Sequence, residues 1–181
     1  METTQLKFTL LQADIFRFLC ENVGREINQS LIAKELDVSS TGVAKALKSL
    51  ERKEIITVKR NNLMNLNIIQ INRENPRAVQ LKRTENLKAI YESGILEKLE
   101  EDFIGGTIIL FGSYSKGEDT FKSDIDLAII GRKDKIIDLS TYEKFLKKEI
   151  IINFYPSFKE IHKNLRENIF NGIVLSGGVE L

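Results

Sequence analysis

The first 72 residues carry a hydrophobic pattern that predicts three helices followed by two strands. Ile15 and Leu19 recur at helical spacing in the first helix, and shorter helical patterns follow over NQSLIAKELDVS and VSSTGVAKALKSLERKEI. Beyond them, the segments IITVK and MNLNI flank the polar turn RNN. Met64, Leu66 and Ile68 alternate with asparagines in the second segment, as a two-stranded ribbon requires.

The third predicted helix has two different faces. Ser39 or Ser40 caps its start, because a serine oxygen can accept a hydrogen bond from a free amide of the first turn. Leu47 lies on an apolar face, whereas Lys45 and Lys48 lie on another. The helix is therefore expected to bury one side and to present a basic side to solvent.

A helical segment over residues 73–103 is expected to connect the two halves of the chain. Pro76 suits the first turn of a helix, and leucines then recur among lysines and glutamates. Gly94 either kinks this helix or splits it into two. The pair Gly105-Gly106 ends it by turn geometry.

The stretch FGSYSKGEDTFKSDIDLAII combines two kinds of unusual chemistry. The strand TIILF ends at Gly112-Ser113, where exposed amides and a hydroxyl favour an anion that the glycine allows to come close. Asp124 and Asp126 are two apart at the next strand, hence on one face, and such a carboxylate pair favours a divalent metal. Together they suit a nucleoside triphosphate with Mg²⁺.

Composition narrows the class of protein. The 181 residues include 42% hydrophobic ones, with a formal net charge of +1. The single Cys20 and the single His162 exclude a disulfide framework and a zinc site of the Cys/His type. No apolar run reaches the roughly 18 residues of a membrane helix, and METTQLKF lacks the layout of a secretory signal. We therefore expect a cytoplasmic protein that does not associate with membranes.

The C-terminal segments are expected to complete the second domain. KKEIIINFYPSF reads as a later strand, and SFKEIHKNLRENIF reads as one helix with His162 on its polar side. The tail NGIVLSGGVEL begins with a helix-ending Asn171-Gly172 pair and is expected to pack against the sheet or a partner subunit.

Residues 1–72 resemble the winged helix-turn-helix domain of prokaryotic transcription regulators, on the residues DVSSTGVAKALKSLERKEII. In that family the third helix enters the major groove of duplex DNA and the wing touches phosphate. Between residues 39 and 60, six Lys or Arg stand against two Glu, a local net charge of +4. The alternative is a structural wing that mediates dimerisation or packing. The resemblance implies DNA contacts by Thr41, Lys45, Lys48, Lys59 and Arg60.

The second half resembles the DNA polymerase β-like nucleotidyltransferases, most closely the small "minimal" prokaryotic members. The resemblance covers roughly residues 77–181 and rests on Phe111-Gly112-Ser113 followed by Asp124-Ile125-Asp126. It implies that Gly112 and Ser113 bind the triphosphate and that Asp124 and Asp126 bind Mg²⁺ and act in catalysis.

A third carboxylate normally completes this site in active members of the superfamily. By alignment with the family pattern, Asn153 falls at its position, and Glu149 at the start of the strand is the other candidate. Asn supplies neither a charge nor a useful base. The sequence therefore leaves catalysis open while it favours nucleotide binding.

The expected fold is α+β: a winged helix-turn-helix over residues 1–72, a helical connector over 73–103, and a nucleotidyltransferase-type mixed β-sheet flanked by helices over 104–181. One hypothesis is an enzyme that transfers a nucleoside monophosphate to a hydroxyl acceptor. The other is a DNA-binding regulator, or an antitoxin, whose weakened nucleotidyltransferase domain senses nucleotide or binds a partner. The minimal members imply a helical toxin-like protein as that partner, and winged-helix regulators imply a homodimer.

Overall fold

The computed structural model describes residues 6–61 and 65–179. The chain forms two compact units, Met1–Lys82 and Arg83–Leu181, and the division falls within a single helix. The domain limits expected near residues 72 and 103 remain predictions. The fold is α+β, as expected from the sequence, and each unit is described below by itself.

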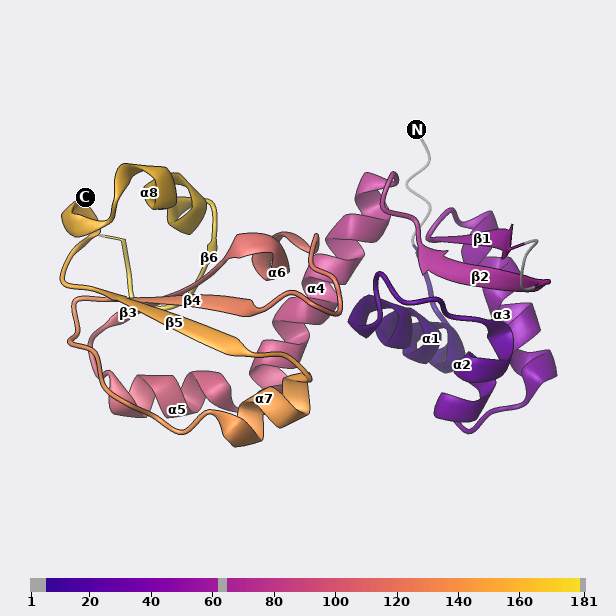
Figure 1. Cartoon of the computed structure of the whole chain (residues 1–181), viewed down its shortest axis with the longest axis horizontal. Coiled ribbons are helices and arrows are strands. Elements are labelled where there is room, and N and C mark those ends of the chain that lie inside the picture. Colours follow the sequence, from indigo (N-terminus) through magenta and orange to yellow (C-terminus); the bar gives the residue numbers. More distant parts are fainter. Residues whose placement is uncertain (1–5, 62–64, 180–181) are drawn as a thin grey trace. The chain divides into compact units, whose positions relative to one another are not determined.

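The first unit contains three helices and a β-hairpin (Figure 1). A side-chain oxygen caps each helix: Thr9, Asn28 and Ser39 accept hydrogen bonds from amides of the first turns, so that Ser39 rather than Ser40 caps the third helix. The elements are α1 (Leu10–Glu21), α2 (Gln29–Glu35), α3 (Ser40–Arg52), β1 (Ile56–Asn61) and β2 (Leu66–Ile71).

The core of this unit follows the helical pattern of the sequence. On α3, Val43 and Leu47 are buried, whereas Lys45 and Lys48 are exposed, which confirms the two predicted faces. Cys20 is buried in the same core. Because this apolar face joins α1, α2 and the hairpin, the opposite face of α3 is left to solvent.

The hairpin pairs β1 and β2 in antiparallel register, with Asn61 opposite Leu66. Part of the predicted RNN turn, together with Met64, lies outside the described residues. Ile69 and Ile71 are the buried positions of β2, whereas Leu66 is 43% exposed. Ile69 and Ile71 lie on the opposite face of β2 from Leu66 and Ile68, so the apolar alternation of the MNLNI segment does not mark the side of the strand that faces the core.

Helices α4 (Pro76–Ser93) and α5 (Ile95–Asp102) replace a single connector helix. Gly94 between them has φ of 75°, a left-handed conformation that favours glycine, and it separates the two helices. Of the two alternatives for Gly94, splitting is therefore correct. Pro76 occupies the first position of α4, where its missing amide costs no hydrogen bond.

The second unit is built on a four-stranded mixed sheet in the order β5-β4-β3-β6 (Figure 1). Strand β4 runs antiparallel to β3 and parallel to β5, and β6 pairs antiparallel with β3. The tail, which was expected to pack against the sheet or a partner subunit, thus contributes an edge strand to the sheet. The remaining elements are β3 (Thr107–Phe111), α6 (Gly112–Lys116), β4 (Ile125–Ile130), α7 (Ser140–Leu146), β5 (Ile150–Tyr155), α8 (Lys163–Phe170) and β6 (Ile173–Ser176).

The two faces of this sheet form separate cores. Leu127 and Ile129 of β4 pack with α5 and α7, whereas Ala128 and Ile130 pack with α8 and a 3₁₀ turn at Phe158–Glu160 (Figure 1). Asp126 follows the even-numbered alternation of β4. It therefore belongs to the face that carries α8.

The helix expected over SFKEIHKNLRENIF is interrupted at His162. Ile161 adopts an extended backbone and is only 1% exposed, so the chain leaves helical geometry to place this side chain in the core. His162 then caps α8, its Nδ1 accepting a hydrogen bond from the amide of Asn164 at 3.4 Å. The prediction of one continuous helix was wrong, because tertiary burial of Ile161 outweighs local propensity.

Candidate active site

A tight turn follows the completely buried strand β3. Gly112 has φ of 73°, and the short helix α6 then ends at Gly117, also left-handed. The amide of Glu118 donates to the carbonyl of Ser113 at 3.0 Å, and the Ser115 hydroxyl donates to the carbonyl of Gly112 at 2.9 Å. Ser113 itself remains partly exposed at the start of the turn. The predicted phosphate-binding residues thus occupy the C-terminal end of β3.

The strand register brings the aspartate pair to this turn. Asp126 lies opposite Phe111 across β3 and β4, and Asp124 directly precedes β4. A Cβ atom on residue 112 would collide with Oδ2 of Asp126. Glycine is therefore needed at position 112 both for its backbone conformation and to admit the carboxylate.

The electrostatics of the pair suit a cation. Burial raises the pKa of Asp126, and the nearby charge of Asp124 raises it further. Among the described residues, no cluster of three or more His, Cys, Asp or Glu side chains is arranged to hold a metal. The pair thus fits Mg²⁺ as a partial set of oxygen ligands, which a bound triphosphate and water can complete.

The neighbouring strand offers no carboxylate beside Asp126. In the parallel register of β4 and β5, Asp126 pairs with Ile151, and Asn153 pairs with Ala128. Partners on adjacent strands share a face, so Ile151, 38% exposed, stands where a third carboxylate would adjoin Asp126. Asn153 lies two residues farther along β5 from the turn. Glu149 is exposed just before β5, its carbonyl accepting from the amide of Ile125 at 2.9 Å.

Sequence reasoning missed a buried polar cluster behind the site. Asp119 is 1% exposed, and Lys148 forms an ion pair with it at 3.4 Å. Asn86 of α4 donates to Asp119 as well, at 2.7 Å. No local sequence pattern indicates that these residues are buried. Lys148, for example, follows another lysine before a strand, a position typical of a solvent-exposed side chain. Lys116 donates to Asn168 of α8 at 3.4 Å.

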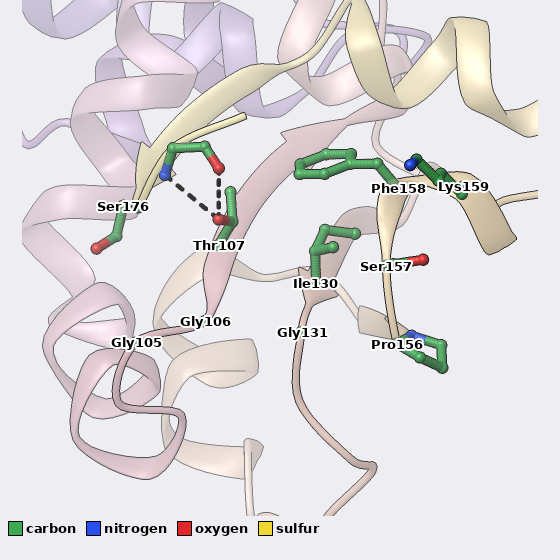
Figure 2. Close-up of a pocket in the computed structure, with 12 residues that line it drawn as sticks. Gly105, Gly106, Thr107, Ile130, Gly131, Pro156, Ser157, Phe158, Lys159 and Ser176 are labelled. Atoms are coloured by element: carbon green, nitrogen blue, oxygen red, sulfur yellow. Dashed lines mark hydrogen bonds between the residues drawn. The ribbon is translucent and has the colours of Figure 1, made fainter. Parts of the chain in front are cut away.

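A pocket of about 600 Å³ lies at the opposite end of the sheet (Figure 2). It includes Thr107 at the start of β3 and Ile130 at the end of β4, whereas the aspartates lie where β4 begins. The Thr107 hydroxyl donates to the carbonyl of Gly178 at 2.8 Å and accepts from its amide at 3.3 Å (Figure 2). A Cβ on Gly177 would come within 2.7 Å of this hydroxyl, so close packing accounts for that glycine.

The residues expected to contact DNA are all exposed in the first unit. They are Thr41, Lys45 and Lys48 on α3, and Lys59 and Arg60 on β1. Lys48 and Arg60 line a groove of about 580 Å³ between α3 and the hairpin, together with Gln29, Asn65 and Asn67. Arg60 donates to Asn65 at 2.7 Å. A basic helix face and the hairpin thus border one groove.

The ammonium group of one basic residue in this region, Lys53, contacts other residues of the first unit. The Lys53 ammonium donates to the carbonyl of Lys7 at 2.7 Å and to the Gln12 side chain at 3.3 Å, and it lies over the Phe8 ring. The charge excess between residues 39 and 60 is therefore not all available to a ligand. Within the described part of the chain, no helix is long and apolar enough to cross a membrane.

Comparison with known proteins identifies the second unit. The family model of the nucleotidyltransferase domain matches residues 92–175, which include β3, the turn at Gly112 and the aspartate pair. A putative protein adenylyltransferase of Methanocaldococcus jannaschii is 40% identical over 73 residues, which cover 39% of this chain and 72% of that protein.

Solved structures of two bacterial regulators show weaker likeness. ZitR of Lactococcus lactis in complex with DNA has a TM-score of 0.42 and 24% identity, over 56% of this chain and 66% of that one. MepR of Staphylococcus aureus, a transcription regulator of a multidrug efflux pump, has a TM-score of 0.41 and 21% identity, over 53% of this chain and 69% of that one. At these scores, the winged-helix assignment rests on the elements of residues 10–71 themselves.

Proposed function

Since the chain belongs to the nucleotidyltransferase domain family, we propose that its second unit binds a nucleoside triphosphate together with Mg²⁺. The observation that carries this proposal is the position of Asp126, opposite Phe111 and against Gly112, beside the turn that follows β3. Backbone amides and the Ser113 hydroxyl are suited to the phosphates, because the glycine lets them approach the backbone. The carboxylates of Asp124 and Asp126 would hold the cation.

The proposed reaction is transfer of a nucleoside monophosphate to a hydroxyl acceptor. Mg²⁺ would supply neutralisation of the triphosphate charge and alignment of its leaving group. The residues of this chain orient the phosphates at Gly112 and Ser113 and hold the metal at Asp124 and Asp126. The relative's name, protein adenylyltransferase, supports ATP as the donor and a protein side chain as the acceptor.

A second candidate function is favoured by Ile151. An isoleucine beside Asp126 supplies neither a metal ligand nor a general base, whose loss commonly costs on the order of 10² to 10⁴ in rate. The domain would then bind nucleotide with slow or absent transfer and serve a regulator or an antitoxin. Its partner would be a helical toxin-like protein, as proposed for the minimal members of the superfamily.

The first unit is proposed to bind duplex DNA through α3 and the hairpin. The exposure of Thr41, Lys45 and Lys48 beside the groove that Arg60 lines supports this proposal. Lysine and arginine contacts to phosphate release counterions, so such binding weakens with salt. A homodimer on a palindromic site is proposed on general grounds of winged-helix recognition.

Calorimetry with ATP and Mg²⁺ tests the nucleotide site. Saturable heat is expected with the parent protein, and none with the double variant Asp124→Ala, Asp126→Ala. Equal weak heats for both proteins would defeat the proposal. Transfer of labelled nucleotide to candidate protein acceptors then separates the enzyme from the nucleotide sensor: labelled acceptor supports the first, and binding without label supports the second.

A further inference from the structure

Three polar residues from separate segments are buried together behind the phosphate turn. Asn86 belongs to α4, Asp119 to the loop between α6 and β4, and Lys148 lies two residues before the start of β5. Asn86 is 6% exposed and Asp119 is 1% exposed, and the side chain of Lys148 is 6% exposed. Burial of two charged groups is costly unless they are paired and hydrogen-bonded. We call these residues the Asn86–Asp119–Lys148 cluster.

Asn86 links the phosphate turn to the loop. Its Nδ2 donates to the carbonyl of Tyr114 in α6 at 2.9 Å and to Oδ1 of Asp119 at 2.7 Å. Tyr114 directly follows Ser113 in the chain. A single amide group thus hydrogen-bonds both to the helix that carries Ser113 and to the loop that leads to the aspartates.

Lys148 fixes the other end of the loop. Besides the ion pair with Asp119, its ammonium donates to the carbonyls of Thr120 and Ser123, the latter at 3.1 Å. These two residues also close a turn, because Ser123 donates its amide to the carbonyl of Thr120 at 3.1 Å and its hydroxyl accepts from the Thr120 amide at 3.0 Å. The Ser123 carbonyl belongs to the peptide bond that enters Asp124.

We propose that Asn86, Asp119 and Lys148 are positioning residues that hold Asp124 in place beside Gly112 and Ser113. The cluster makes contacts with α4, α6, the loop and the segment before β5. The phosphate turn and the carboxylate pair are therefore both anchored to the same group of residues. The inference rests on the proposed nucleotide site. It assigns to this cluster the role of keeping the phosphate turn and the two aspartates at a fixed spacing.

The experiment must separate positioning from stability. Lys148→Met alone removes the ion pair between Lys148 and the buried Asp119 and should lower the melting temperature. The pair Asp119→Asn with Lys148→Met removes both charges at similar size and keeps an amide oxygen for Asn86. We expect its melting temperature to return toward that of the parent. Its affinity for ATP with Mg²⁺ should still fall about 10-fold or more, because the Thr120 and Ser123 carbonyls lose their ammonium.

A second variant and a control guard against misfolding. Asn86→Leu deletes the hydrogen bonds to Tyr114 and Asp119 at similar volume and should also weaken ATP binding. Lys144→Met changes an exposed lysine of α7 and should leave both affinity and melting temperature unchanged. Amide hydrogen exchange of residues 118–124 in the absence of nucleotide gives an independent measure, and it should be faster in both cluster variants.

The outcomes distinguish the two proposals. Parent affinity and parent exchange in folded cluster variants would overturn the positioning role. A parent protein that binds no ATP with Mg²⁺ would instead defeat the proposed nucleotide site. In that case unchanged exchange of residues 118–124 would also overturn the proposal that the cluster holds the loop, whereas faster exchange would support it.

Discussion

The carboxylate of Asp126 lies so close to Gly112 that a Cβ at position 112 would collide with it unless the carboxylate moved. This relationship joins two short motifs that are separated in the chain by the rest of α6 and the following loop. It arises because β3 and β4 pair antiparallel, with Phe111 opposite Asp126. The glycine at the end of β3 therefore serves the carboxylate as well as the turn.

Substitution of Gly112 by alanine should reduce stability and abolish binding of ATP with Mg²⁺. The left-handed backbone alone costs a non-glycine residue about 1–2 kcal/mol, and the collision with Asp126 adds to it. Gly94→Ala is the matched control, since Gly94 has φ of 75° but no atom within 4 Å of the added Cβ. Thermal unfolding and calorimetry measure both variants. Equal losses of stability and unchanged binding in Gly112→Ala would contradict the collision.

Removal of the Asp126 charge should stabilise the metal-free protein at neutral pH. The pKa of Asp126 is raised in the fold by burial and by Asp124, so the ionised form is disfavoured in the folded state and a neutral Asn relieves that cost. Mg²⁺ should raise the melting temperature of the parent but not of Asp126→Asn. Asp138→Asn should instead lower the melting temperature at neutral pH. Hydrogen bonds from Ser140 lower the pKa of Asp138, so they favour its ionised form in the folded state. A lower melting temperature of metal-free Asp126→Asn would refute the prediction.

Restoration of a carboxylate at position 151 should increase nucleotide transfer. Ile151 is the partner of Asp126 on β5, so Asp at this position would share its face and add a metal ligand or base. We expect a gain of about 10-fold or more over the parent, measured with labelled ATP and a protein acceptor, out of the 10² to 10⁴ that such a group commonly supplies. Ile151→Asn controls for polarity without charge. A gain in Asn153→Asp but none in Ile151→Asp would show that the deeper position completes the site.

Replacement of Lys45 and Lys48 by alanine should weaken binding to duplex DNA. The salt dependence of binding should fall by up to about two phosphate contacts, because each lysine releases counterions when it meets phosphate. Lys53→Ala is the control: its ammonium bonds to the Lys7 carbonyl, so it should lower the melting temperature and leave the salt dependence unchanged. Fluorescence anisotropy over a salt titration measures both. An unchanged slope in the double variant would exclude α3 as the DNA-binding surface.

Much of the architecture is encoded locally and was predicted from the sequence. Periodic apolar positions indicate helices such as α3, with Val43 and Leu47 buried, since a helix repeats its faces every few residues wherever it packs. The Gly112-Ser113 turn and the Asp124-Ile125-Asp126 segment are likewise recognisable, because backbone conformation and charge repulsion constrain those residue types at short range.

Tertiary structure alone decided which residues meet. Strand register places Ile151 rather than Asn153 beside Asp126, and a shift of two residues along β5 separates these two alternatives. Burial of Ile161 divides a segment that has helical periodicity on both sides of His162. Asn86, Asp119 and Lys148 come together from three segments of the chain. A buried charge is stabilised by partners that the fold brings near it, and the spacing of these residues in the sequence does not indicate that they will meet.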